Sequence, residues 1–156
     1  MNSRNNPKDC LAAALRLLAR RDHSRSELSR KLVERGFPQD EIKAAISECL
    51  RLDYLDDERY ATDFTQLLQR KGYGRHRIRQ MLIAKGLTLQ VIAACLDVCC
   101  PDAMQIRGCR RAMFKKLKGD KRMQDSAEAR ARLYRFLYSR GFSSSIIRQA
   151  MDEEPV

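Results

Sequence analysis

The chain of 156 residues carries a formal net charge of +11, with six cysteines and two histidines. No apolar run approaches the roughly 18 residues that a membrane span requires, and the start of the chain lacks the apolar stretch of a secretory signal. We therefore expect a cytoplasmic protein without a membrane partner. His23 and His76 have no spaced partner for catalysis, and no Gly-x-x-x-x-Gly-Lys phosphate loop occurs, so we expect neither an enzyme nor a cofactor.

Apolar residues spaced three and four positions apart predict helices along nearly the whole chain. Each of three sections is expected to hold three helices, and in the first two sections the apolar spacing predicts that the opening helix is amphipathic. The second helices are expected over residues 24–35, 75–85 and 127–140. Pro38, Thr88 and Ser143 mark the start of the third helices, since Thr and Ser can cap a helix and proline suits its first turn.

A glycine between a basic and an apolar residue recurs three times along the chain. Gly36, Gly86 and Gly141 each follow a second helix, at the position where a left-handed residue caps the helix end. Spacings of 50 and then 55 residues between these glycines predict three repeats. Apolar residues at the same offsets around each glycine are expected in the core: Leu28, Leu32, Ile42, Ile78, Leu82, Ile92, Leu133, Leu137 and Ile147.

The repeats predict an all-α protein of three tandem three-helix bundles, arranged as an elongated, curved solenoid-like array. We place the first repeat at residues 1–53, the second at 54–100 and the third at 101–156, with an extra loop near 119–124. The acidic junction before Tyr60 is expected to be an ordered corner in which Asp56 or Asp57 caps the next helix. A magnesium site there is the more complicated alternative. We expect a monomer.

The cysteines invite a metal or disulfide interpretation. Cys10, Cys49 and Cys95 fall on apolar helix faces, where free cysteine behaves as a small hydrophobe. Cys95, Cys99 and Cys100 do cluster, but there is no Cys-x-x-Cys pair and no second pair of ligands at zinc spacing. We therefore expect packing or loop thiols and no bound metal.

Positive charge is unevenly distributed along the chain. Residues 1–63 hold 12 basic and 12 acidic side chains, whereas residues 64–96 hold basic side chains and no acid. This asymmetry predicts a polyanionic partner, either nucleic acid, nucleoprotein or an acidic protein surface, with a solvated helix surface as the alternative. The candidate binding residues are Arg70, Lys71, Arg75, Arg77, Arg79, Lys85, Arg110, Arg111, Lys115, Lys116, Lys118, Lys121, Arg122 and the arginines at repeated positions, Arg25, Arg75 and Arg130. For the repeated arginines, packing of the side-chain stem on a neighbouring unit is an equal alternative.

The second and third helices of each unit, joined by a tight glycine turn, resemble a helix-turn-helix motif. The third helices are nevertheless poor base readers. Residues 38–50 include Asp40, Glu41 and Glu48, and residues 88–97 offer Gln90 as their polar contact residue before Asp97. Sequence-specific DNA recognition is therefore disfavoured, while non-specific phosphate contacts stay open.

Three separate motifs resemble those of one family. Residues 14–21 (ALRLLARR), followed by Ser24-Arg25-Ser26-Glu27-Leu28 and Lys31-Leu32, are similar to the opening signature of the RecX regulatory proteins. Residues 54–61 (YLDDERYA) resemble the central motif of that family. Gly72-Tyr73-Gly74-Arg75 with Ile78-Arg79-Gln80 and Lys85-Gly86-Leu87 resembles the motif after it. The similarity covers roughly residues 8–152 and is strongest up to Leu96.

This resemblance implies tandem three-helix units and a role as a modulator, mainly an inhibitor, of the RecA recombinase in DNA repair, recombination and the SOS response. RecX-like proteins bind RecA and its filament on DNA, and restrain filament growth, strand exchange and coprotease activity. We hypothesise that the array lies in the filament groove, spans more than one subunit, and blocks addition or promotes loss of subunits. The alternatives are a non-specific DNA-binding protein acting without RecA and an adaptor for an unrelated acidic protein.

Overall fold

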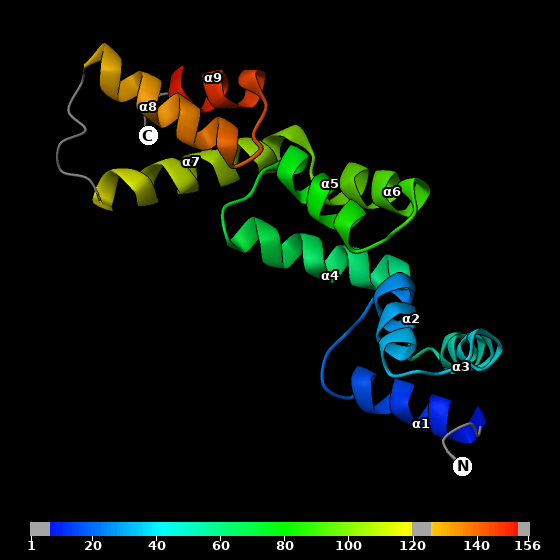
Figure 1. Cartoon of the computed structure of the whole chain (residues 1–156). Coiled ribbons are helices and arrows are strands. Elements are labelled where there is room, and N and C mark those ends of the chain that lie inside the picture. Colours follow the sequence, from blue (N-terminus) through cyan, green and yellow to red (C-terminus); the bar gives the residue numbers. More distant parts are fainter. Residues whose placement is uncertain (1–6, 120–125, 153–156) are drawn as a thin grey trace.

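The computed structural model describes residues 7–119 and 126–152, and this part of the chain contains nine helices and no strand. Figure 1 shows three units following one another along an elongated molecule, which confirms the predicted all-α array. Gly119 ends a helix, and the rest of the expected loop near 119–124 lies outside the described residues. The helices are α1 (Pro7–Leu18), α2 (Arg25–Glu34), α3 (Gln39–Arg51), α4 (Asp57–Arg70), α5 (Arg75–Ala84), α6 (Leu89–Cys99), α7 (Asp102–Gly119), α8 (Ala127–Ser139) and α9 (Ser144–Asp152).

Each unit encloses a small core of its own. The first helix of each unit packs mainly against the third, and the second helix closes the bundle. All nine apolar residues predicted from the glycine repeat are buried, none more than 6% exposed. Leu55, which the proposed boundary assigns to the second repeat, packs into the core of the first. The chain between α3 and α4 thus belongs physically to the first bundle.

The helix ends carry the predicted caps. Gly36, Gly86 and Gly141 have φ angles of 83°, 73° and 91°, in the left-handed region that a side chain disfavours. At the acidic corner, the Asp56 carboxylate accepts hydrogen bonds from the backbone N–H groups of Glu58 and Arg59 and so caps α4. Asp57 instead accepts the backbone N–H of Arg25 at 2.8 Å, which links the first turn of α2 to the second unit.

The second helices of the three units meet end to end, and these contacts form the joints of the array. At the first joint, the Ser24 hydroxyl before α2 donates to the Lys85 carbonyl at the end of α5. At the second joint, the backbone N–H groups of Gly74 and His76 donate to the carbonyls of Arg140 and Gly141 at 2.8 and 3.0 Å. The negative C-terminal end of one helix therefore faces the positive N-terminal end of the next.

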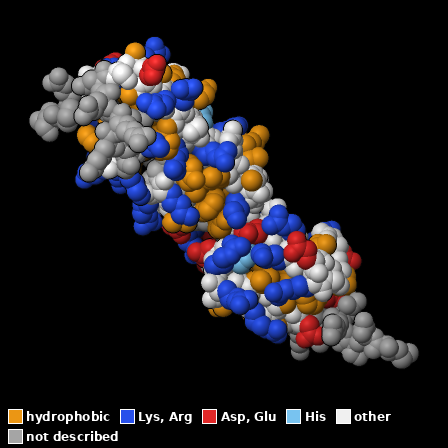
Figure 2. All heavy atoms as spheres, turned by 60° about the vertical axis from the view of Figure 1, so that its left-hand side comes forward, with side chains coloured by type: hydrophobic (Ala, Val, Ile, Leu, Met, Phe, Trp, Pro, Cys, Tyr) orange, Lys and Arg blue, Asp and Glu red, His pale blue; other side chains and the backbone are white. Residues whose placement is uncertain are grey.

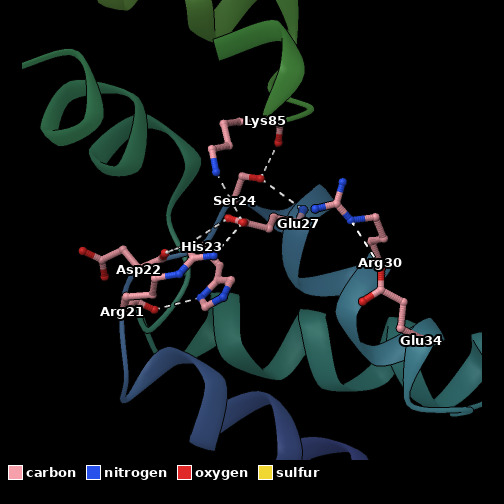
Figure 3. A network of polar contacts seen from close by, with 8 residues as sticks. All are labelled: Arg21, Asp22, His23, Ser24, Glu27, Arg30, Glu34 and Lys85. Carbon is pink, nitrogen blue, oxygen red and sulfur yellow. Dashed lines mark hydrogen bonds and ion pairs between the residues drawn. The ribbon is translucent and has the colours of Figure 1, made fainter. Parts of the chain in front are cut away.

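A buried carboxylate occupies the first joint. Glu27 on α2 is 5% exposed and accepts two hydrogen bonds from the Arg21 guanidinium, at 2.8 and 3.2 Å. The Lys85 ammonium of the second unit approaches the same carboxylate at 3.4 Å, as Figure 3 shows. The hydrogen bonds from Arg21, aided by Lys85, lower the pKa of Glu27 to about 2. An ionised Glu27 thus holds cations from two different units.

His23 lies beside this carboxylate and is also buried. Its Nδ1 is 2.8 Å from the carbonyl oxygen of Arg21 (Figure 3). Burial lowers the pKa of the imidazole, since the charged form would lose hydration next to Arg21. His23 therefore supports the loop that presents Arg21 and is a structural residue of the joint.

The second joint leaves no room for a side chain on its glycine. A Cβ atom on Gly141 would collide with the backbone nitrogen and Cβ of Arg77, whereas a Cβ on Gly36 would meet nothing within 4 Å. Gly36 ends α2 on the side away from the second unit, where it contacts neither of the other two units. The same turn is therefore a cap at all three sites and a joint at the two internal ones.

Replacing Gly141 with Ala is expected to destabilise the protein more than replacing Gly36. Both changes force an alanine into the left-handed region, at about 1 to 2 kcal/mol, but Gly141→Ala adds a collision worth about 1 to 3 kcal/mol. Urea unfolding measures the difference, and amide exchange at Gly74 and His76 should accelerate in this variant alone. Equal losses in both variants would show that the turn is not a joint.

Replacing Glu27 with Gln is expected to lower the free energy of unfolding at pH 7 by about 2 to 3 kcal/mol, because two cations lose their buried partner. The folded-state pKa of Glu27 is depressed, so its contribution is present above the unfolded value near 4.5 and is lost as pH falls towards 2. The gap between wild type and variant should shrink over that range, as measured by urea unfolding at successive pH values.

Glu34→Gln provides the matched control on the same helix. Glu34 is 64% exposed and faces Arg30 at 3.8 Å in a surface pair (Figure 3), so its loss should cost less than about 1 kcal/mol. If Glu27→Gln proves as mild as Glu34→Gln, the joint does not depend on the buried charge.

Candidate polyanion interface

A basic groove lies where the second and third units meet. It has a volume of about 360 Å³ and combines the end of α4 with α7 and the end of α8. Five of the predicted binding residues come together here, and no acidic residue lines the groove within the described part of the chain. The lining residues are Arg70, Lys71, Gly72, Arg111, Ala112, Lys115, Lys116, Phe136 and Arg140.

Helix geometry explains how these cations are presented. Arg70 is the last residue of α4 and Lys71 is its C-cap, so both sit at the negative end of that helix. On α7, Arg111 and Lys115 are four residues apart and therefore share one side of the helix. Another side of α7 buries Cys109 against the third core, and Ala112 lies at the edge between the two sides, in the core and at the groove wall. Core packing thus fixes the direction in which the cations point.

Arg140 and Phe136 are groove residues that the sequence analysis missed. The Arg140 guanidinium lies over the rings of Tyr73 and Phe136, with centroid distances of 5.0 and 5.2 Å, and donates to the Lys71 carbonyl at 3.3 Å. Lys116 covers Phe136 at 5.4 Å. The sequence feature that could have identified Arg140 is its position directly before a repeated glycine. At Gly86 and Gly141 this position lies at a joint between units as well as at a helix end.

Arg75 and Lys85 require a correction. The absence of acids from residues 64–96 suggested that these two cations are not neutralised, but acids from elsewhere in the chain reach both. Arg75 donates to Asp97 at 2.6 Å and to the carbonyls of Leu96 and Cys100, which closes the end of α6. Lys85 is bound to Glu27. Both side chains serve the internal structure, and that of Arg75 does so within its own unit, not on a neighbouring one.

The other predicted residues are not part of the basic groove. Arg25 and Arg79 are exposed, and Arg77 lines a separate groove with His76 and Tyr138. Arg130 faces Asp152 at 3.7 Å. Arg110 is half-buried and Lys118 is exposed, both on the outer side of α7. Lys121 and Arg122 lie outside the described residues.

The surface view supports the uneven charge seen in the sequence. Figure 2 shows Asp and Glu side chains mixed with Lys and Arg over the first unit and at its junction with the second. Over the other two units, Lys and Arg surround an apolar patch with few acids between them. The cationic half of the molecule, residues 64–156, therefore supplies every residue of the basic groove.

The cysteines are disposed as hydrophobic packing residues. Cys10, Cys49, Cys95, Cys100 and Cys109 are buried, and burial raises the pKa of Cys100 and Cys109 to about 11. The Cys95 and Cys99 sulfur atoms are 4.0 Å apart. Among the described residues, no group of three or more His, Cys, Asp or Glu side chains is placed to hold a metal ion.

No single described helix is long and apolar enough to cross a membrane, although the bent pair α6 and α7 together reaches that length and composition.

Solved structures share this fold. A crystal structure of a regulatory protein RecX superposes with a TM-score of 0.83 at 21% identity, covering 94% of this chain and 73% of that one. RecX from Lactobacillus salivarius gives a TM-score of 0.83 at 22% identity, covering 94% of both chains.

Sequence comparison is more specific. This chain is 39% identical to the regulatory protein RecX of Vibrio campbellii over 142 residues, which cover 91% of this chain and 89% of that protein. It is 32% identical to the RecX of Trichlorobacter lovleyi, covering 98% and 100% of the two chains. Domain models of the first, second and third RecX three-helix domains match residues 10–49, 56–96 and 108–151. The chain therefore belongs to the RecX family of regulatory proteins.

Proposed function

We propose that this protein regulates the RecA recombinase by binding RecA and its filament on DNA, and that it mainly limits filament growth, strand exchange and coprotease activity. Membership of a family of regulatory proteins supports a regulatory role. The observation that carries the proposal is the basic groove, which concentrates cations at a fixed joint of an elongated molecule.

The groove suits a nucleoprotein filament better than a small ligand. Its cations come from three helices of two units, so a partner that fills it contacts a wide surface. Positive charge without nearby acid attracts phosphates or acidic protein surfaces over several ångströms. Because the joints hold the three units in a row, an elongated surface is available, and on this proposal it contacts more than one subunit of the filament. Such contacts would hinder the addition of further subunits.

Non-specific DNA binding without RecA remains the alternative function, and the same groove favours it. The third helices give it little further support, because α3 exposes Asp40 on its first turn and α6 exposes the apolar Leu89 and Val98. Base recognition in the major groove depends on exposed Arg, Asn or Gln side chains, whereas these positions hold an acid and two apolar residues. DNA contacts by this chain are therefore expected to be phosphate contacts.

The groove is tested by removing charge from Arg70, Lys71 and Lys116 together. Gln keeps the aliphatic stem and suits a helix, so the Gln triple variant should fold normally. Wild type is expected to inhibit RecA ATPase on single-stranded DNA at substoichiometric ratios. The concentration of the variant that gives the same inhibition should be at least about tenfold higher than that of wild type, a change in binding free energy of about 1.4 kcal/mol.

Three exposed cations of the first unit, Arg16, Arg20 and Lys43, supply the control. Replacing them with Gln gives a triple variant with the same net charge as the groove variant. This control should inhibit like wild type. Equal weakening by both triple variants would point to net charge alone, and inhibition that appears only when the DNA is saturated would favour the alternative function.

A further inference from the structure

The outer face of α7 carries a cationic stripe with an aromatic residue in its middle. Its members stand at offsets 0, 3, 4, 7, 8 and 11 along the helix, the spacing of one continuous helix face. Five are basic and the other is Phe114, and no acidic residue lines this face in the described part of the chain. The stripe consists of Arg107, Arg110, Arg111, Phe114, Lys115 and Lys118.

Phe114 is not needed by the core of its own unit. The inner face of α7 buries Gln105, Cys109 and Ala112 instead, and the third core is filled from that side. Phe114 is 44% exposed. A large apolar side chain at the centre of a charged, outward face stabilises the folded unit little, so its place calls for a partner that binds both cations and an aromatic ring.

We propose that this face of α7 binds single-stranded nucleic acid, with phosphates on the cations and an unpaired base stacked on Phe114. The inference rests on the proposed function, since it names the part of a RecA–DNA filament that the cationic half would contact. Every base has a flat aromatic face, so stacking is independent of sequence. In a duplex those faces are covered by neighbouring base pairs, which leaves phosphate contacts alone. The site therefore discriminates single strands from duplex.

The stripe and the basic groove form one continuous surface. Arg111 and Lys115 line both. The stripe from Arg107 to Lys118 is about 16 Å long at 1.5 Å per residue, enough for about five phosphates of a stacked strand at 3.4 Å each. The ring of Phe136 in the groove is already covered by Lys116 and Arg140. Phe114 is thus the aromatic ring on this surface that is open to a base.

A single substitution supplies a direct reporter of stacking. The chain has no tryptophan, so Phe114→Trp introduces the sole indole of the protein. Stacking of a base should quench its fluorescence. We expect quenching on titration with oligo(dT), and clearly less with the same strand in a duplex or with inorganic polyphosphate, which carries charge without bases. Equal quenching by polyphosphate, or none by oligo(dT), would overturn the proposal.

Affinity measurements separate stacking from charge. Phe114→Leu keeps an apolar side chain but should weaken oligo(dT) binding by roughly 5- to 150-fold, the loss expected for one stacked base, and leave duplex binding unchanged. Tyr54→Leu, which removes a 54% exposed aromatic of the first unit, should change neither. Arg107→Gln and Lys118→Gln should each reduce the salt slope for single strands by about 0.7, whereas Phe114→Leu should not.

The same variants distinguish this inference from the proposed function. If Phe114→Leu binds oligo(dT) like wild type, the stacking site is refuted, whatever happens to RecA inhibition. If it loses RecA inhibition with oligo(dT) affinity intact, Phe114 contacts protein and the inference is again wrong. If it loses single-strand affinity while wild type fails to inhibit RecA, the site stands and the proposed function falls.

Discussion

The end-to-end contact between second helices is the constraint on which the array depends. Each bundle is too small to bury a wide apolar surface, and the contacts between units are largely polar: backbone amides on carbonyls, a hydroxyl on a carbonyl, and a carboxylate between two cations. Such contacts are directional, so they set the angle between units as well as their distance. The glycine turn allows them, since a Cβ atom on Gly86 would collide with Ser26, and one on Gly141 with Arg77.

The two joints use the same repeat position for different purposes. Lys85 and Arg140 both precede the joint glycine, and both lie over a phenylalanine ring, that of Phe64 and of Phe136 respectively. Lys85 then turns to the buried Glu27, whereas Arg140 faces the basic groove and is not paired with an acid in any described contact. At the first joint Lys85 is therefore paired inside the molecule, whereas at the second joint Arg140 faces the groove. This difference places the candidate interface at the second joint.

The sequence was informative wherever a residue acts through its near neighbours. Left-handed glycines, the Asp56 cap and the apolar repeat positions follow from helix periodicity and capping, which extend over a turn or two. The pairing of Glu27 with Lys85 spans 58 residues, and only the fold brings these two together. Counting local acids therefore overstated the free charge of residues 64–96. The cations that α4 and α7 bring to the groove were predictable from their local clusters, whereas the position of the α8 end beside them depends on the second joint.

Charge divides the molecule into two chemically different parts. Residues 1–63, which comprise the first unit, the acidic corner and the first half of α4, hold 12 basic and 12 acidic side chains, so a polyanion gains little by approaching them. The whole net charge of +11 lies in residues 64–156, which comprise the rest of the second unit and the third unit, where Arg111 and Lys115 serve both the groove and the α7 stripe. On the proposed function, residues 64–156 orient the nucleoprotein partner, and the first unit contacts it through exposed apolar side chains such as Val33 and Tyr54. The first joint would transmit that orientation, because Glu27 binds both Arg21 of the first unit and Lys85 of the second.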